Sequence, residues 1–597
     1  MKSSVQSVFL STLMLWLAFC LLLVTSACSQ EQKAKVQDAA AGILPGQGQL
    51  TSGPQPHVDT VYVEKYMAAK PAFKNEIEWG KKFYKERDGR LGWFKNHQLV
   101  PQTERMLTEL SKAGENGLDP KKYKVVDFAQ LFAQIKKAPD TTARNALEKE
   151  IDVALSATYF NWADDFYRGI VDPREVKNID WKVKRNKIKL HKALMTILQE
   201  RESTYPYYEF APLHPEYDRL RKALANYRAM QRNGGWLPVP AVKKALRPGD
   251  SSAVVPALRR RLLGFNPDGT PNPAVANAPM QAMPVSNKPG QPAAAAPRES
   301  HKYDAELAAA VKAFQQQTGL KADGRLTPET VTMLNVPLQR RIDQIIVNME
   351  RWRWIPKRFE PNYLLVNIPD YHMWVYENGK PALDMRVIVG KTLNATPVFS
   401  DKMEYVVVAP YWNVPYSIID KELRNKLAAD PNGTLNRLDM EVVKGSGAKA
   451  TPVDPTSIDW ANLTQSTWRY TLRRRPGPKN DLGDVKFLFP NSQDIYLHDT
   501  PHDELFSQAK RGFSHGCVRV EKPLVLAEYL LRNKPGWDMS KIQQTVAEGK
   551  EQYVTLPEKL PVYLVYFTAW VDDAGNLHFR DDIYGHDKAL AQEYFST

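Results

Sequence analysis

Cysteine is scarce in this 597-residue chain, which contains only three. Cys20 and Cys28 lie in or beside an apolar N-terminal segment, so Cys517 is the single cysteine of the remaining chain. One thiol excludes a disulfide scaffold and a cysteine-rich zinc site. The eleven histidines are scattered, and no His-x-x-x-His pair with a nearby carboxylate indicates a metal, so we expect none. A lone thiol beside histidines instead suggests a nucleophile.

Long apolar runs are also lacking, except for Val8 to Val24 near the N-terminus. A lysine before this run and small residues after it, in Thr25-Ser26-Ala27-Cys28, form the layout of a secretory signal over residues 1–28. The small residues resemble the lipobox of bacterial lipoproteins, in which Cys28 would be lipidated, although Thr25 stands where such boxes carry an aliphatic residue. An ordinary cleaved signal and an uncleaved membrane anchor stay open. Each of these places the body of the chain outside the cytoplasm, behind a flexible tether at residues 29–57.

The chain carries a formal net charge of +14 and has a pI near 9.3, which favours an acidic partner. No helix-turn-helix, zinc-finger spacing or RNA-binding signature accompanies this charge, so we expect no nucleic acid. Outside the cytoplasm the acidic polymers are cell-wall glycans, teichoic acids and lipid head groups. The alternative is that these basic residues only solvate the surface.

The first half of the chain is predicted to be helical. Apolar residues with helical spacing indicate a scaffold domain at 58–240. A second unit at 246–335 contains Gly319-Leu320, Asp323-Gly324 and a helix capped by Thr327, and this order resembles the three-helix peptidoglycan-binding domain family. A Pro/Ala/Asn-rich segment at 266–299 interrupts the unit and is predicted to be a disordered insertion. Whether the unit binds glycan or only orients its neighbours stays open.

The second half is predicted to be mainly β. Short β-branched and aromatic runs, with an Asn378-Gly379 hairpin turn, define a domain at 338–550. A long stretch at 417–485 interrupts these strands, and an insertion of this size beside a catalytic segment is often a lid. We interpret residues 551–597 as a C-terminal β extension. The predicted fold class is therefore a multidomain α+β protein.

Two segments carry the chemistry. His498 lies on a strand-like run that ends at Pro501, and Ser514-His515-Gly516-Cys517-Val518-Arg519 follows after a polar loop. A cysteine attacks as its thiolate, so Cys517 needs a base, for which His498 is the candidate. The backbone N–H groups of Gly516 and Cys517 are candidates for an oxyanion hole. Arg519 is a candidate either for holding a substrate carboxylate or for a structural ion pair. The alternative to a nucleophilic Cys517 is an inert, buried cysteine.

These segments resemble the signature of the L,D-transpeptidase catalytic domain family, and Val389-Gly390, Thr396-Pro397 and Trp412-Asn413-Val414-Pro415 extend the resemblance upstream. With the scaffold, the binding-type unit and the insertion, the chain resembles the large periplasmic members of Gram-negative bacteria. The resemblance implies that the cysteine attacks a tetrapeptide stem at diaminopimelate, releases D-Ala and forms a thioester. The amine of a second diaminopimelate then resolves the thioester and leaves a 3-3 cross-link.

The resemblance also implies roles for single residues. The carbonyl of Asp499 orients the ring of His498, the backbone of His515, Gly516 and Cys517 forms the oxyanion hole, and Tyr496, Trp412 and Arg519 bind substrate. The segment at 417–485 is then a capping subdomain, no cofactor is needed, and carbapenems acylate the same cysteine. The expected location is the periplasm, with the membrane reached through the N-terminal segment. A sortase-like or hydrolytic cysteine enzyme, an L,D-carboxypeptidase and a catalytically silent wall-binding lipoprotein stay open.

Overall fold

The computed structural model describes residues 54–596, except 178, 180, 184, 200–213, 274–299 and 446–449. The predicted signal, the candidate lipidation site Cys28 and most of the tether lie outside the described residues, as does most of the insertion predicted at 266–299. Within the described part of the chain, every helix is too short or too polar to cross a membrane.

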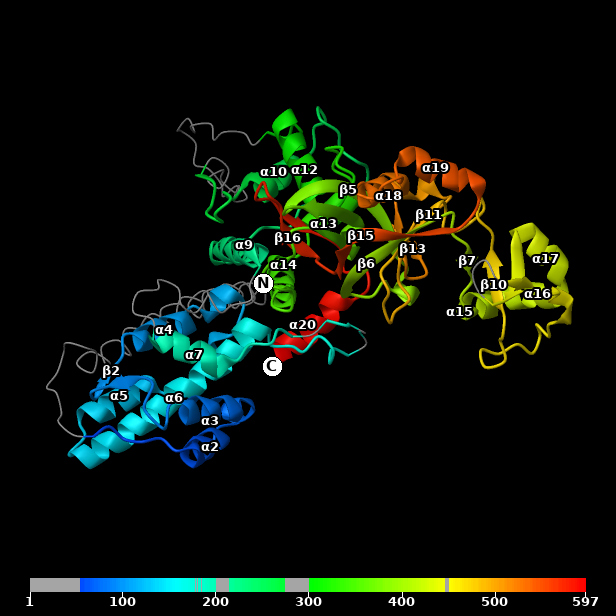
Figure 1. The fold of residues 1–597 in the computed structure, drawn as a ribbon. Helices are drawn as coiled ribbons and strands as arrows, with labels where there is room; N and C mark the ends of the chain where they lie inside the picture. The colour runs from blue at the N-terminus through cyan, green and yellow to red at the C-terminus, as the bar shows by residue number, and fades with distance from the viewer. Residues whose placement is uncertain are drawn as a thin grey trace, which may run out of the picture.

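The scaffold is a helical domain, as predicted, and lies at the blue and cyan end of the ribbon (Figure 1). Its central element is the long helix α6, capped by Asp140, whose side chain accepts a hydrogen bond from the backbone N–H of Ala143 at 2.7 Å. Asp152 lies fully buried on α6, where it accepts hydrogen bonds from the Tyr84 hydroxyl and from two backbone N–H groups. The scaffold helices are α2 (Thr60–Ala68), α3 (Ile77–Glu86), α4 (Gln102–Ser111), α5 (Phe128–Lys136), α6 (Thr141–Arg168), α7 (Leu190–Gln199) and α9 (Pro215–Arg232).

A small helical unit follows the scaffold, with its own apolar core. It consists of α10 (Val255–Leu263), α12 (Ala305–Gln317) and α13 (Pro328–Leu334). The predicted cap of α13 is present, because the Thr327 hydroxyl accepts a hydrogen bond from the Thr330 N–H at 3.1 Å. Helix α14 (Leu338–Trp352) then leads into the β-rich part of the chain.

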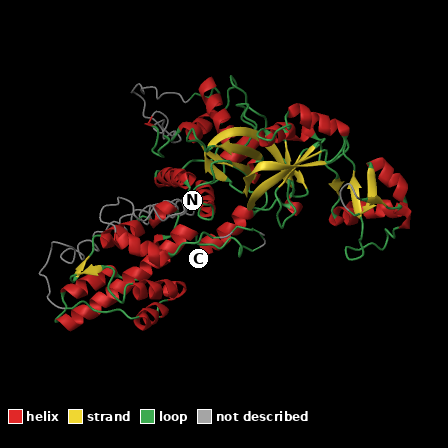
Figure 2. Cartoon of the chain, in the orientation of Figure 1, coloured by secondary structure: helices red, strands yellow, loops and turns green. Residues whose placement is uncertain are grey.

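A nine-stranded sheet forms the centre of the molecule (Figure 2). The strand order is β13-β5-β14-β12-β11-β6-β15-β3-β4, and a further pairing of β4 with β5 closes the sheet on itself. Helices α18 (Pro523–Leu531) and α19 (Met539–Glu548) contribute side chains to its core. The strands are β3 (Tyr363–Asn367), β4 (His372–Glu377), β5 (Lys380–Gly390), β6 (Phe399–Val408), β11 (Val485–Leu488), β12 (Leu497–His498), β13 (Gly512–Ser514), β14 (Val518–Val520) and β15 (Gln552–Val565).

The insertion at 417–485 is a separate subdomain that stands off from the main sheet (Figure 1). It pairs strands in the order β7-β10-β8-β9 and has an apolar core of its own. The sequence analysis did not predict that β7, which precedes residue 417, belongs to this sheet. Its elements are β7 (Trp412–Asn413), α15 (Tyr416–Ile418), η6 (Ile419–Leu423), α16 (Arg424–Ala429), α17 (Pro431–Leu438), β8 (Met440–Lys444), β9 (Thr451–Pro452) and β10 (Thr471–Arg474).

The prediction of a separate C-terminal β extension from residue 551 is wrong. Strand β15 pairs with both β6 and β3 inside the main sheet, so these residues complete the sheet that begins at β3. Only β16 (Ala569–Val571), β17 (Leu577–Phe579) and α20 (His586–Ser596) lie outside the sheet, and they pack with α14 and α9 in a junction core. Adjacent strands of a sheet often come from distant parts of a sequence, which is why the boundary could not be placed from local composition.

Candidate active site

The strand register brings the segment that contains His498 and the segment that contains Cys517 next to each other in the sheet. Strand β12 pairs in parallel with β14, so that Leu497 lies opposite Val518 and His498 opposite Arg519. On the other side β12 pairs with β11, where Lys486 lies opposite His498. Because side chains alternate along a strand, Lys486, His498 and Arg519 form a row across one face. Tyr496 and Cys517 directly precede β12 and β14, two residues before His498 and Arg519, and the ring centres of Tyr496 and His498 lie 5.7 Å apart.

His498 is held in one orientation. Its side chain is 5% exposed, and Nδ1 lies 2.5 Å from the backbone carbonyl oxygen of Asp499. A carbonyl can only accept, so Nδ1 carries the proton and Nε2 keeps its lone pair. Burial lowers the pKa of His498 to about 3, and the positive charges of Arg519 and Lys486 act in the same direction. The imidazole is therefore neutral and suited to accept a proton at Nε2.

Asp499 is itself fixed by its neighbours. Its carboxylate accepts hydrogen bonds from the backbone N–H groups of Asp484 at 2.7 Å and Thr500 at 2.6 Å. Burial raises the pKa of this carboxyl to about 6. The carboxylate of Asp499 thus fixes the turn, and the backbone carbonyl of Asp499 orients the ring of His498.

The loop between β13 and β14 is shaped by hydrogen bonds within it. The Ser514 hydroxyl donates to the Cys517 carbonyl oxygen at 2.5 Å and accepts from the Gly516 N–H at 3.1 Å. Gly516 has a φ of 122°, which strongly disfavours a side chain there, and its carbonyl accepts from the Thr396 hydroxyl at 2.7 Å. Of the three predicted oxyanion donors, the Gly516 N–H is thus already engaged by Ser514 in this arrangement.

The Cys517 thiol is half-buried and protonated at rest. Burial raises its pKa, while the backbone of Tyr496 and the charge of Lys486 oppose that rise. Among the described residues, Sγ donates to the Asp494 carbonyl oxygen at 3.9 Å, so the imidazole is not its acceptor in this arrangement. A neutral thiol next to one strand and a neutral imidazole on the adjacent strand fit general-base activation, in which the proton moves as the substrate is attacked.

Lys486 was not identified in the sequence analysis. Its Nζ lies 4.2 Å from the centre of the Tyr496 ring, and its charge acts on both Cys517 and His498. Burial lowers the pKa of this half-buried lysine, while the charges of Cys517 and Glu551 raise it. Lys486 is the single polar residue of the otherwise apolar strand β11, which could have drawn attention to it in the sequence. Only the strand register shows that it lies opposite His498.

The predicted substrate-binding residues are divided between two sheets. Tyr496 directly precedes β12 and Arg519 lies on β14 in the main sheet, and among the described residues the buried Nε of Arg519 has no hydrogen-bond partner. Burial lowers the pKa of Arg519. Trp412 instead lies on β7 in the sheet of the insertion, half-buried against that core with the Arg474 guanidinium 5.4 Å from its ring centre.

The insertion contacts the catalytic loop directly. Nε2 of His515 lies 3.1 Å from Oε1 of Glu422 on η6, and both side chains are about half exposed. Glu422 was not identified from the sequence, because only the fold brings the two segments together. The insertion therefore contacts the residue two positions before Cys517.

Family models match three parts of this chain. An L,D-transpeptidase catalytic domain model matches residues 361–546, which contain the whole face just described. This part of the chain is similar to the L,D-transpeptidase catalytic domain family. A scaffold domain model matches residues 78–224, and a peptidoglycan-binding domain model matches residues 292–334. The three matches follow the predicted order of domains.

One relative and two solved structures are similar to parts of this chain. A Haemophilus influenzae protein named as an L,D-transpeptidase is 38% identical over 247 residues, which cover 41% of this chain and 48% of the relative. The chain thus spans about half the length of that relative. A cysteine-to-serine mutant of the Enterococcus faecium L,D-transpeptidase is 14% identical, with a TM-score of 0.14, over 35% of this chain and 50% of that one. The Xylanimonas cellulosilytica L,D-transpeptidase fragment is 14% identical, with a TM-score of 0.16. The match covers 55% of this chain and 100% of that fragment.

Proposed function

We propose that this protein is a peptidoglycan L,D-transpeptidase that forms 3-3 cross-links through a thioester on Cys517. The observation that carries the proposal is the parallel register of β12 and β14, in which His498 lies opposite Arg519, two residues after Cys517. The matched catalytic domain and the matched peptidoglycan-binding domain support a wall substrate.

In the first step a tetrapeptide stem is the donor. Nε2 of His498 takes the thiol proton as Sγ of Cys517 attacks the carbonyl carbon at the L-centre of diaminopimelate. The C–N bond to D-Ala then breaks, and the imidazolium returns the proton to the leaving amine. A thioester remains on the sulfur, and the backbone N–H groups of His515 and Cys517 stabilise the oxyanion on the way, together with that of Gly516 once it is released from Ser514.

In the second step the side-chain amine of another diaminopimelate attacks the thioester carbon. His498 takes a proton from this amine, the C–S bond breaks, and the thiolate recovers the proton. The products are a 3-3 linked peptide and the free thiol, so atoms and protons balance without a cofactor. If water replaced the amine, the same site would act as an L,D-carboxypeptidase.

Nearby positive charge opposes the rise in the pKa of the Cys517 thiol that burial causes. Lys486 and Arg519 lie on either side of His498, and the charges of both interact with Cys517. They lower the free energy of a transient thiolate and raise that of an imidazolium. His498 is therefore protonated only briefly, between taking up the thiol proton and giving it to the leaving amine. We place this chemistry in the periplasm, with the chain tethered by its N-terminal segment or by lipid on Cys28.

The proposal is tested by incubating the purified protein with disaccharide tetrapeptide and analysing the products by mass spectrometry. We expect cross-linked dimers and free D-Ala from the native protein and neither from Cys517→Ala. Conversion to disaccharide tripeptide alone would replace the proposal by a carboxypeptidase. A carbapenem should add once to the native protein, at Cys517, and an equal adduct on Cys517→Ala would contradict the proposed nucleophile.

A further inference from the structure

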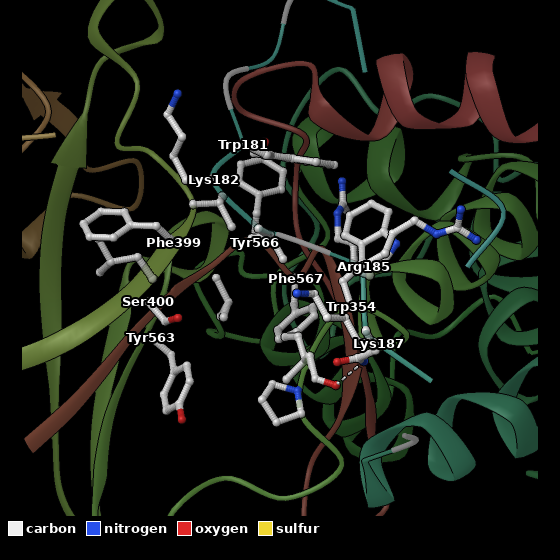
Figure 3. Close-up of a pocket in the computed structure, with 18 residues that line it drawn as sticks. Trp181, Lys182, Arg185, Lys187, Trp354, Phe399, Ser400, Tyr563, Tyr566 and Phe567 are labelled. Atoms are coloured by element: carbon white, nitrogen blue, oxygen red, sulfur yellow. Dashed lines mark hydrogen bonds between the residues drawn. The ribbon is translucent and has the colours of Figure 1, made fainter. Parts of the chain in front are cut away.

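A cavity of about 430 Å³ opens where the scaffold meets the sheet (Figure 3). One wall is made by residues 181–183 and 185–187, between α6 and α7. The opposite walls are the residues after α14, the start of β6 and the end of β15. Its volume lies in the range of cavities that bind small molecules.

The lining of this cavity combines positive charge with aromatic rings. Its basic residues are Lys182, Arg185, Lys187 and Arg351, and no described residue that lines it is Asp or Glu. Figure 3 shows the aromatic side chains around the cavity, which are Trp181, Trp354, Phe399, Tyr563, Tyr566 and Phe567. Such a lining excludes cations and favours an anion that carries an apolar or ring-shaped body.

Arg351 provides a second observation that points to a ligand. Its side chain is only 4% exposed, and its guanidinium lies 5.5 Å from the ring centre of Trp181 and 5.2 Å from that of Tyr566, both of which line the cavity. Nη1 forms an ion pair with Asp587 at 2.6 Å. Among the described residues, however, Nε and Nη2 have no hydrogen-bond partner. Both nitrogens are covered by surrounding atoms, so Arg351 contributes a buried positive charge to the cavity wall, and such a charge attracts an anion.

We propose that this cavity is a second binding site, for an organic anion of small-molecule size. Its carboxylate or phosphate is attracted by Arg351 in the wall and by Lys187 at the rim, and its body lies against the aromatic walls. Asp587 compensates Arg351, Asp164 compensates Arg185 at 2.8 Å, and the exposed Lys187 adds positive charge at the rim.

The cavity is separate from the face that carries His498. It touches β6 at Phe399, whereas Lys486, the strand partner of His498, pairs with β6 at Val407. Eight residues of strand separate these points, which is about 26 Å. The site is therefore independent of the thiol and of the proposed transpeptidation. A bound anion here would hold the scaffold, α14 and the sheet together.

The test uses the full chain with Cys517→Ala and a fluorescent anion, anilinonaphthalene sulfonate, against its uncharged analogue phenylnaphthylamine. We expect saturable binding of the anion, weakened at least tenfold by Lys182→Glu with Lys187→Glu and by raised salt. The matched control is Lys189→Glu, an exposed lysine of the same segment that does not line the cavity, which should change the affinity less than twofold. Arg351→Gln should also weaken binding if that variant folds.

Displacement then distinguishes the two sources of the anion. Loss of the fluorescent probe on adding N-acetylmuramoyl dipeptide would assign a wall-derived carboxylate, and loss on adding glycerol phosphate would assign a phosphate. Equal affinity for the charged and uncharged probes, or equal effects of the paired substitutions and of Lys189→Glu, would overturn the proposal. Because the protein used lacks the thiol, none of these outcomes depends on transpeptidase activity.

Discussion

Replacing Lys486 by methionine is expected to raise the pKa of Cys517. Methionine keeps the apolar stem of the side chain and its packing on Tyr496, and it removes only the charge. A positive charge near a thiolate stabilises the ionised form, so its loss moves the thiol pKa upward. Fewer thiolates would then be present at any pH below that pKa.

The size of the effect follows from the strand geometry. Lys486 is two strands from Cys517 and reaches back over Tyr496, so its charge lies between one and two strand spacings away, or about 7 Å. At an effective dielectric constant of about 20, this separation corresponds to roughly 2 kcal/mol, or between one and two pKa units. Alkylation at neutral pH should therefore slow by about tenfold or more.

The assay is the rate of iodoacetamide addition to Cys517 as a function of pH, followed by intact mass. Lys486→Arg is the matched control, because it keeps the charge and should stay close to the native curve. Cys517→Ala shows any background from other groups. A Lys486→Met curve that coincides with the native curve would refute the reasoning, as would an equal displacement in Lys486→Arg.

Three further predictions concern the base, the pH range and the fold. His498→Gln should slow carbapenem acylation by about 10² to 10⁴-fold with little change in melting temperature, and acylation at a native rate would remove His498 from the mechanism. Because the pKa of His498 is lowered to about 3 and that of Cys517 is raised, both groups keep one protonation state between about pH 5 and 8. The acylation rate should be nearly constant there, and a decline below pH 7 that His498→Gln abolishes would contradict this. Arg353→Met should destabilise the chain to urea by about 3–5 kcal/mol, because it leaves the fully buried Glu350 without its ion-pair partner at 2.8 Å. Adding Glu350→Gln should recover part of that loss, and no recovery would argue against the buried charge as the cause.

Much of the catalytic sheet could be predicted, because its signals are local. The Asn378-Gly379 turn joins β4 to β5 as expected, with φ angles of 50° and 74° that suit these two residue types. The strand that ends near His498 and the loop before Cys517 were also predicted. The motif residues could be named because their types, order and spacing all lie within one short stretch of sequence.

The rest depends on contacts between distant segments. Lys486 lies opposite His498 only through the register of β11 and β12, and Glu422 meets His515 only because the insertion folds back. Strand β15 was taken for a separate extension because its partners, β3 and β6, come some 150 to 200 residues earlier. A single sequence shows each of these residues without its neighbours.

The most direct test of the central claim is to trap the acyl-enzyme. The native protein is incubated with disaccharide tetrapeptide, quenched in acid before an acceptor is added, and digested for mass spectrometry. The account predicts a disaccharide tripeptide attached through a thioester to the peptide that contains Cys517, with one D-Ala released per adduct. Release of D-Ala with no adduct on that peptide, or an adduct that persists in Cys517→Ala, would contradict it.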